Sequence, residues 1–510
     1  MKPVNSGIVK NSVLNAAAGL ALLLTGFASS VLVARLLGPE ANGMIAFSLW
    51  MVVTGSLIAE LGTGISMLRI LPQLVARGYD SKARRGFGAF LAWPVTAATL
   101  WLAVASTLWL HYEGPDHGLA STPVIALLTG GLFITQSLAS FAKSFLIGEQ
   151  QLGFFFRVSA VSAVLQVAGV GIGAWYWGVE GALAGYALGQ IPLFLTTFNV
   201  LRTKPDSCGM QPKQIASTSF LIIIEFIVAA VFLTRPEIVF LQEFRTSEAV
   251  GYYAVATSLA NLALQLPMQL TGSLVPYYAA HAEENGKLSS DLLVTVMRNF
   301  AYLTLPMSFG LAAVAEPLVT SIYGPAFREA GIIVTILAAG VPAAMFVQLC
   351  TQYVFAMDRQ DIRLRTTIVG SIAMALGLFA AVPFLGGEGA AAMRNVTYVV
   401  MGLFIIRFIP KSGNNSGIVL RILRIALAAL VTAAVAYAAT QALPGVAGVL
   451  VGIVAGALVY VPALRLMRAV DPADKTTLAG LSVRVPQRLR PLYVRIIDLA
   501  APGQGQVDTP

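Results

Sequence analysis

Charged residues are scarce in this 510-residue chain: only 11% of its positions are Asp, Glu, Lys or Arg, while 57% are hydrophobic. Soluble globular proteins carry about 25% charged and 45–50% apolar residues. So few charges cannot cover the surfaces of several soluble domains, and the same composition excludes disordered, collagen-like and coiled-coil chains. The sequence therefore predicts a polytopic membrane protein.

Cysteine and histidine are also rare, with two and three residues respectively. Cys208 and Cys350 provide no disulfide framework, and three histidines leave little for metal binding or acid–base chemistry. The chain has no GxxxxGK[ST] pattern, so it does not hydrolyse ATP by itself. The longest predicted outer connection, about 111–121, is too short for a catalytic domain. We expect no enzyme activity, no metal site and no cofactor, with coupling to H⁺ or Na⁺ left open.

Long apolar runs dominate what is present. A helix needs about 20 mostly apolar residues to cross ~30 Å of hydrocarbon. Fourteen such runs predict an all-α protein with about 14 transmembrane helices, near residues 12–34, 43–67, 88–110, 122–147, 157–177, 179–200, 216–241, 250–276, 299–319, 331–355, 366–385, 388–408, 421–441 and 445–467.

The distribution of basic residues predicts the orientation. With the N-terminus in the cytoplasm, 27 Lys and Arg residues fall on the cytoplasmic side and three on the outer side. This asymmetry is a strong positive-inside signal and predicts that both termini are cytoplasmic. The net charge of +9 is then explained by loops that face anionic lipid, and we expect no nucleic-acid partner.

The sequence contains an internal repeat. EANGMIA at 40–46 matches EAVGYYA at 248–254, and VEGA at 179–182 matches GEGA at 387–390, both at an offset of 208. Since this offset covers six helices, the halves share one orientation, which is a known transporter plan. We predict two parallel six-helix lobes facing a cavity: an N-lobe (1–201) and a C-lobe (216–410).

The remaining segments fall outside the repeat. Residues 202–215 form a predicted cytoplasmic linker between the lobes, and 411–470 hold two further helices without a charge between 425 and 464. Residues 471–510 are predicted to form a cytoplasmic interfacial tail whose end is disordered.

Several stretches resemble a known group of transporters. They are VLVARLLGPEANGMIAFSL from 31, ELGTGISMLR from 60, EAVGYYAVATSL from 248 and IYGPAFREAGIIVTILAAG from 322. Over about 8–470, the chain resembles the multidrug/oligosaccharidyl-lipid/polysaccharide (MOP) exporter superfamily. The similarity is greatest to its polysaccharide transporter branch, the Wzx-type flippases.

The resemblance implies a function and a location. The expected protein is a two-lobe flippase of the bacterial inner membrane. It moves an undecaprenyl-diphosphate-linked oligosaccharide, such as an O-antigen or exopolysaccharide repeat unit, from the cytoplasmic to the periplasmic leaflet by alternating access. Glycosyltransferases and a polysaccharide polymerase are the implied partners, besides membrane lipid. The alternatives are a cation-coupled drug antiporter of the same superfamily and a flippase for the peptidoglycan precursor.

Basic residues inside or near the spans are candidates for binding a diphosphate, because intramembrane charges are costly and usually face a cavity or a partner. Arg suits phosphate through its planar fork of donors. Spans 1 and 7 are equivalent in the repeat, and they carry Arg35 and Arg235. The cationic candidates are Arg35, Lys143, Arg235 and Arg394. Arg35 and Lys143 have a competing explanation as snorkelling side chains, and Arg235 as a member of a structural ion pair, whereas Arg394 has no obvious acidic neighbour in its own span.

Acidic and amide residues complete the predicted site. Glu60, Glu225 and Glu237 are ion-coupling candidates, since a carboxyl in a low dielectric exchanges protons readily; a carboxyl hydrogen-bonded between helices is the alternative. The sugar-contact candidates are two pairs spaced four apart, Gln265 with Gln269 and Gln348 with Gln352. Bonding between helices is the commoner use of such residues. Prolines inside spans, such as Pro306 and Pro342, predict kinks.

Overall fold

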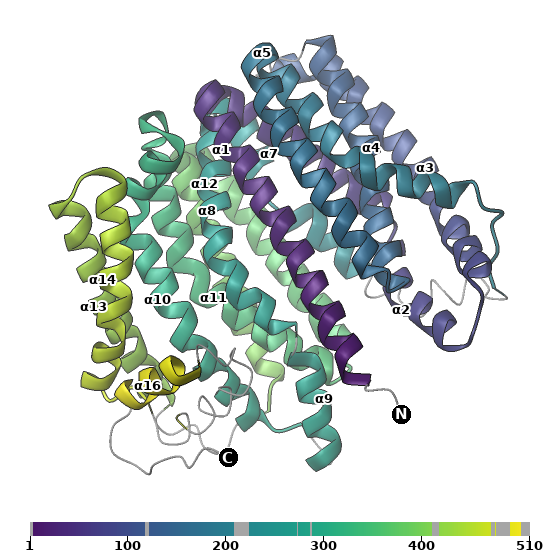
Figure 1. Ribbon diagram of the computed structural model, residues 1–510. Helices are drawn as coiled ribbons and strands as arrows, with labels where there is room; N and C mark the ends of the chain where they lie inside the picture. Colours follow the sequence, from purple (N-terminus) through teal and green to yellow (C-terminus); the bar gives the residue numbers. More distant parts are fainter. Residues whose placement is uncertain are drawn as a thin grey trace. The chain divides into compact units, whose positions relative to one another are not determined.

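The computed structural model describes residues 4–117, 122–208, 224–272, 274–285, 288–410, 418–470, 475 and 490–500. The described chain is helical, with short turns and 3₁₀ segments between helices (Figure 1). The second half of the predicted 202–215 linker and most of the predicted 471–510 tail lie outside the described residues.

The chain divides into two compact units. The first contains residues 1–255 and 374–390, and the second contains 256–373 and 391–510. The helices, in chain order, are α1 (Val4–Ala59), α2 (Thr63–Ala76), α3 (Ser81–Tyr112), α4 (Pro123–Gly148), α5 (Leu152–Leu201), α7 (Glu237–Phe244), α8 (Ser247–Thr271), α9 (Leu274–Asn285), α10 (Ser290–Tyr323), α11 (Ala330–Ala356), α12 (Gln360–Ile405), α13 (Ile418–Ala442), α14 (Gly445–Leu466) and α16 (Arg490–Ala500).

Three of these helices each contain two membrane-crossing segments. Non-helical backbone interrupts α1 at Gly38, α5 at Gly178 and α12 at Gly386. Nine described helices are long and apolar enough to cross a membrane. Because α1, α5 and α12 each provide two crossings, these nine helices provide twelve. With the segment 224–244 and α8, they account for the 14 predicted crossings and confirm the all-α polytopic class.

The backbone confirms the internal repeat independently of side-chain identity. Gly178 has φ 57° and ψ −133°, while Gly386, 208 residues later, has φ 55° and ψ −132°. Likewise Gln150 and Asp358 precede α5 and α12 with φ of 58° and 57°. Glycine adopts positive φ at little cost. The hairpins within α1, α5 and α12 therefore each reverse at a glycine.

The structure corrects three predicted span boundaries. Span 7 (216–241) is not one helix: the chain is helical at 224–232, breaks at 233–236 and resumes as α7. Span 2 (43–67) ends at Ala59, so Glu60 lies in a turn before α2. Arg298, assigned to a cytoplasmic loop, is buried within α10, because the apolar pattern of Leu293 and Val296 extends this helix toward its N-terminus.

Helix packing in the first unit centres on α5. Its two arms pack against α1 and α4, and α3 lies along α4 (Figure 1). Phe133, Phe141 and Phe145 of α4 are at most 3% exposed and fill the space between these helices. The apolar faces that the sequence pattern predicts are therefore buried against one another within this unit.

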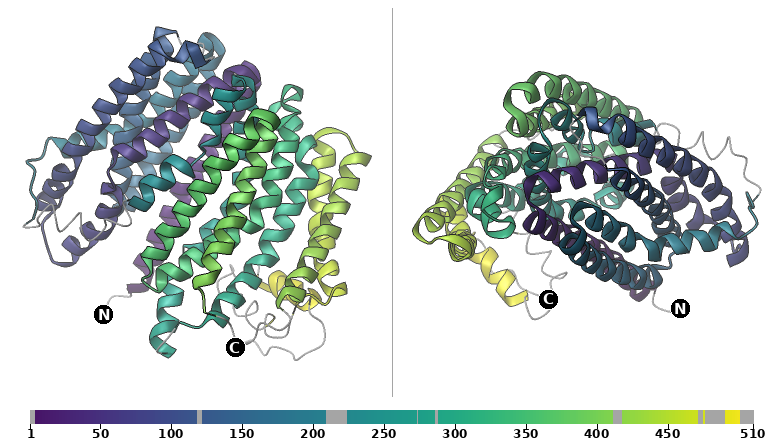
Figure 2. Two further views of the ribbon diagram at one scale, coloured as in Figure 1. Left: turned by 180° about the vertical axis from the view of Figure 1, so that it is seen from behind. Right: turned by 90° about the horizontal axis from the view of Figure 1, so that it is seen from above.

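In the second unit, α10 packs against α11, α13 and α14, and α13 lies beside α14, as both views in Figure 2 show. Pro306 in α10 cannot donate to the carbonyl of Tyr302, four residues earlier. Tyr460 of α14 donates its hydroxyl to that carbonyl at 2.7 Å. Ser308 does the same at 2.7 Å for Ala338, the carbonyl that Pro342 leaves free in α11. Both carbonyls that the prolines leave free are therefore bonded by side chains from neighbouring helices.

We expect Tyr460→Phe to destabilise the second unit. Removing the hydroxyl leaves the Tyr302 carbonyl without its donor, and an unsatisfied buried acceptor costs about 1–3 kcal/mol. The change should lower the apparent melting temperature of the purified protein in detergent. Tyr437→Phe on the exposed face of α13 is the matched control, and an equal shift for both variants would contradict a stabilising role of the Tyr460 hydrogen bond.

Candidate functional site

The structure brings Glu60 and Lys143 together in the first unit. Glu60, in the turn between α1 and α2, is 6% exposed, and its Oε1 has no hydrogen-bond partner among the described residues. Ser140 and Lys143 of α4 are the side chains that interact with this carboxyl. A predicted ion-coupling acid and one of the predicted cationic contacts therefore interact, although Lys143 itself remains exposed.

Arg35 is exposed on α1, three residues before the interruption at Gly38. This position at the end of the first segment agrees with its prediction from sequence. A side chain so placed can reach a polar ligand or the membrane interface.

Arg235 differs from its prediction because it lies in the break at 233–236 and not within a helix. Its φ is 58°, and it is half-buried. By the 208-residue offset it corresponds to Phe27, where α1 is continuous, so the equivalence with Arg35 holds for the spans and not for the residues. Glu237 follows at the first turn of α7 and is completely buried, and Glu225 is half-buried in 224–232. A carboxylate at a helix N-terminus is favoured by the helix dipole.

Arg394 is half-buried in α12, in the second unit. One of its guanidinium nitrogens, Nη1, lies 3.4 Å from the hydroxyl of Tyr398, one turn later. The adjacent Asn395 donates to the carbonyl of Ile336 in α11 at 2.6 Å, which fixes this turn of α12 against α11. Arg394 is thus presented from a well-anchored segment.

The glutamine candidates divide between the two expected uses. Gln348 of α11 donates to the hydroxyl of Thr271 at the end of α8 at 3.3 Å, which is a bond between helices. Gln265 and Gln352 are half-buried, while Gln269 is exposed. The latter three stay candidates for contact with sugar hydroxyls.

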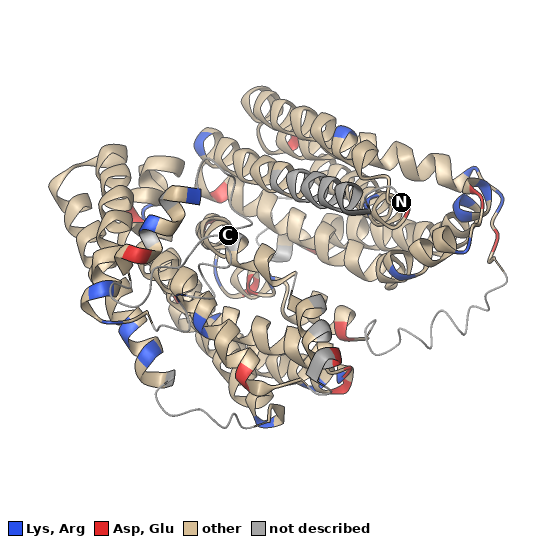
Figure 3. Cartoon of the chain, turned by 60° about the horizontal axis from the view of Figure 1, so that its bottom comes forward, with Lys and Arg blue, Asp and Glu red and all other residues tan. Residues whose placement is uncertain are grey.

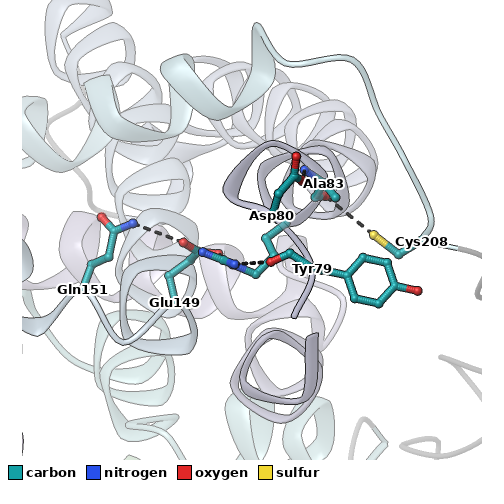
Figure 4. Close-up of polar contacts among 7 residues, drawn as sticks. Tyr79, Asp80, Ala83, Glu149, Gln151 and Cys208 are labelled. Atoms are coloured by element: carbon teal, nitrogen blue, oxygen red, sulfur yellow. Dashed lines mark hydrogen bonds and ion pairs between the residues drawn. The ribbon is translucent and has the colours of Figure 1, made fainter. Parts of the chain in front are cut away.

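Basic and acidic residues gather at helix ends, and the helix interiors are largely free of charge (Figure 3). At one such end of the first unit, Arg84 of α3 donates to Glu149, which follows α4, with Nε 2.7 Å from Oε1 (Figure 4). Gln151 donates to the other carboxylate oxygen at 3.1 Å, and Arg84 also donates to the carbonyl of Tyr79. Only 1% of the Glu149 side chain is exposed. This cluster joins the α2–α3 and α4–α5 turns.

The beginning of the linker after α5 is tied to the same end of α3. The amide of Asp206 donates to the carbonyl of Gly86 at 3.0 Å. The Cys208 thiol donates to the carbonyl of Ala83 at 3.6 Å, as Figure 4 shows. Burial, with the nearby carboxylates of Asp206 and Asp80, raises the pKa of the Cys208 thiol. The thiol therefore stays protonated at neutral pH and can donate.

A close backbone contact joins equivalent positions of the two repeats within the first unit. Gly43 of α1 and Gly251 of α8 are 208 residues apart. A side chain on Gly43 would collide with the carbonyl of Ser247, and one on Gly251 with the carbonyl of Pro39. Asn42 donates its side-chain amide to the carbonyl of Gly251 at 3.1 Å. The second segment of α1 thus packs against α8, backbone to backbone, at equivalent positions of the repeat.

Sequence reasoning missed two of these features as functional elements. Gly43 and Gly251 lie inside the 40–46 and 248–254 match, so the aligned glycines were the available signal. No sequence signal indicated the Arg84–Glu149 pair, because 65 residues separate its members and only the fold brings them together.

Comparisons with known proteins agree with this architecture. The family described as "Polysaccharide biosynthesis protein" matches residues 32–332. Among solved structures, the chain is similar to the lipid II flippase MurJ in an inward closed conformation, with a TM-score of 0.70 and 14% identity over 89% of this chain and 98% of that one. A sequence search of curated proteins finds no match.

Two solved MATE transporters share the fold as well. An inward-facing multidrug resistance MATE family transporter of the MOP superfamily has a TM-score of 0.57 and 15% identity over 76% of this chain and 94% of that one. The Vibrio cholerae MATE transporter VcmN has a TM-score of 0.54 and 15% identity over 79% of this chain and 96% of that one.

Proposed function

Because the chain belongs to the family of polysaccharide biosynthesis proteins, we propose that it is a flippase for a polyprenyl-diphosphate-linked oligosaccharide and not an enzyme. The cargo moves from the cytoplasmic to the periplasmic leaflet of a bacterial inner membrane, with both termini of the protein in the cytoplasm. The family match over 32–332 carries the proposal, and the MOP transporter fold supports it.

The proposed cycle uses the repeat. Two lobes, 1–201 and 216–410, alternate between inward-open and outward-open states, as parallel repeats do in other transporters. A diphosphate cannot enter hydrocarbon without replacement of its hydration, and guanidinium donors provide that replacement. Arg394, held by the anchored turn of α12, is assigned to the diphosphate, with Arg35, Arg235 and Lys143 as further contacts.

Gln265, Gln269 and Gln352 are assigned to the sugar hydroxyls. Glu60 is assigned to coupling, because its buried carboxyl lies beside Lys143 in a turn between two helices. A conformational change that separates Lys143 from Glu60 would favour proton uptake by the carboxyl. Glu225 and Glu237 are secondary candidates for the same role.

The first experiment compares lipid extracts from cells with and without this protein. We expect cells lacking it to accumulate a polyprenyl-diphosphate-linked oligosaccharide and to lose surface polysaccharide. The wild-type gene should restore both, while Arg394→Ala should lower restoration at least tenfold at equal protein level, because a charged hydrogen bond is worth about 1.5–3 kcal/mol. If Glu60 couples transport, Glu60→Gln should fail to restore it.

The outcomes separate the alternatives. Full restoration by Arg394→Ala would keep the flippase and remove that residue from the site. Accumulation of peptidoglycan precursor would assign the chain to the other lipid-linked substrate, the one carried by its structural neighbour. Unchanged surface polysaccharide with new sensitivity to cationic compounds would indicate a drug antiporter.

A further inference from the structure

The first unit contains an apolar groove along the hairpin of α5. Its volume is about 630 Å³, which is within the range of small-molecule sites. Leu165 and Ile172 of the first arm, Leu188 of the second arm and Leu128 of α4 form its walls. Gly169 and Gly185 form its floor, where the two arms touch: a side chain on Gly185 would collide with the main chain of Gly169.

The groove faces outward from the helix bundle. Ile172 is 57% exposed, Leu188 39% and Trp177, at one end, 66%. Most of the groove is lined by Leu, Ile, Ala and Gly, which offer water no side-chain hydrogen bonds, so at hydrocarbon depth lipid chains cover it. The groove therefore opens toward the bilayer.

The length of the groove matches one leaflet. It runs from Leu165 to the hairpin tip at Gly178, which is roughly 20 Å at 1.5 Å per residue. Half of a hydrocarbon core is about 15 Å. Trp175 and Tyr176, 71% and 70% exposed, belong with Trp177 to an aromatic group of the kind found at membrane interfaces. The tip and the mouth of the groove thus lie at headgroup depth.

Among the described residues that line the groove, Glu180 carries the one carboxylate. Glu180, two residues beyond the tip, lines the groove, is half-buried and accepts a hydrogen bond from the Thr122 hydroxyl at 2.9 Å. A negative charge at headgroup depth repels a phosphate-only headgroup and attracts an ammonium group. It also disfavours a prenyl diphosphate, whose charges would lie against it.

From these features we propose that the groove binds one acyl chain of phosphatidylethanolamine in the leaflet opposite the basic loops, with Glu180 accepting hydrogen bonds from the ammonium group. The apolar walls take the chain, and the carboxylate selects the headgroup. The inference does not rest on the proposed function, because bound lipid is measured without transport.

Native mass spectrometry of the full chain, released from detergent supplemented with equal amounts of phosphatidylethanolamine and phosphatidylglycerol, tests the proposal. We expect a retained phosphatidylethanolamine molecule, favoured roughly tenfold over phosphatidylglycerol, as a charged hydrogen bond would give. Glu180→Gln keeps the shape and can still accept from Thr122, but it should abolish the preference. Ala184→Trp should fill the groove and reduce retention to the detergent background.

Val164→Phe is the matched control, since Val164 lies on the same arm of α5, is 70% exposed and does not line the groove. Equal retention of the two lipids by the wild-type protein would overturn the proposal, as would an unchanged preference in Glu180→Gln. Displacement by a polyprenyl phosphate at equal concentration would also overturn it, because the groove would then belong to the transported lipid. If Ala184→Trp fails to fold, the lipid preference of Glu180→Gln still tests the role of the groove.

Discussion

Replacing Gly43 or Gly251 by alanine is expected to abolish transport and to lower stability by more than the usual 1–3 kcal/mol of overpacking. The reason is that the atoms in the way belong to the main chain. A methyl group on Gly43 would overlap the carbonyl of Ser247, and one on Gly251 that of Pro39. Side chains relieve a clash by changing rotamer, but here two helices must separate, which also breaks the hydrogen bond from Asn42.

The measurement is the apparent melting temperature in detergent, together with restoration of surface polysaccharide in cells lacking the protein. Gly131→Ala in α4 is the control, because a side chain there meets no atom within 4 Å. Alanine favours a helix by about 1 kcal/mol over glycine, so the control should be neutral or slightly stabilising. Normal stability and transport in Gly43→Ala would contradict the proposed backbone contact.

The same contact bears on how the repeat works. Gly43 and Gly251 occupy equivalent positions, so the contact joins two copies of one structural element. Such a contact changes least when the elements rotate about the axis that relates them. A valine at either position should therefore impair the conformational cycle in addition to stability.

Much of this fold was predictable from sequence, for identifiable reasons. Apolar runs of about 20 residues were readable because the thickness of the bilayer sets the length of every crossing. The asymmetry of Lys and Arg was readable because basic residues collect in the cytoplasmic loops. The repeat was readable from short matches such as VEGA at 179–182 with GEGA at 387–390, which directly follow Gly178 and Gly386, where the backbone has positive φ. Local backbone demands of this kind leave a trace in residue identity.

Other features were not predictable, because they depend on contacts between distant segments. The break at 233–236 lies inside the apolar run predicted as span 7, and apolar composition does not distinguish a continuous helix from an interrupted one. Arg298 was assigned to a loop from the sequence, whereas the structure buries it within α10. The proximity of Glu60 and Lys143 could not be read from an 83-residue separation, so acid and base were assigned to separate roles.

Breaking the Arg84–Glu149 pair is the second change for which we expect a large effect. Since 1% of the Glu149 side chain and 18% of the Arg84 side chain are exposed, Arg84→Ala leaves a buried carboxylate without its countercharge. Removing one partner of a buried pair costs about 3–5 kcal/mol. We expect a marked fall in apparent melting temperature, with Arg85→Ala, one residue along and exposed, close to wild type.

The double variant Arg84→Met with Glu149→Met decides whether charge or packing is responsible. The desolvation cost of both ions disappears together with their attraction, so apolar replacements of similar length are often neutral or stabilising. The double variant should therefore recover most of the stability that Arg84→Ala loses, although Gln151 loses its acceptor as well. If it is instead as unstable as Arg84→Ala, the pair acts through the hydrogen bonds that Arg84 and Gln151 make between the α2–α3 and α4–α5 turns, and those bonds, rather than charge balance, hold this end of the first unit together.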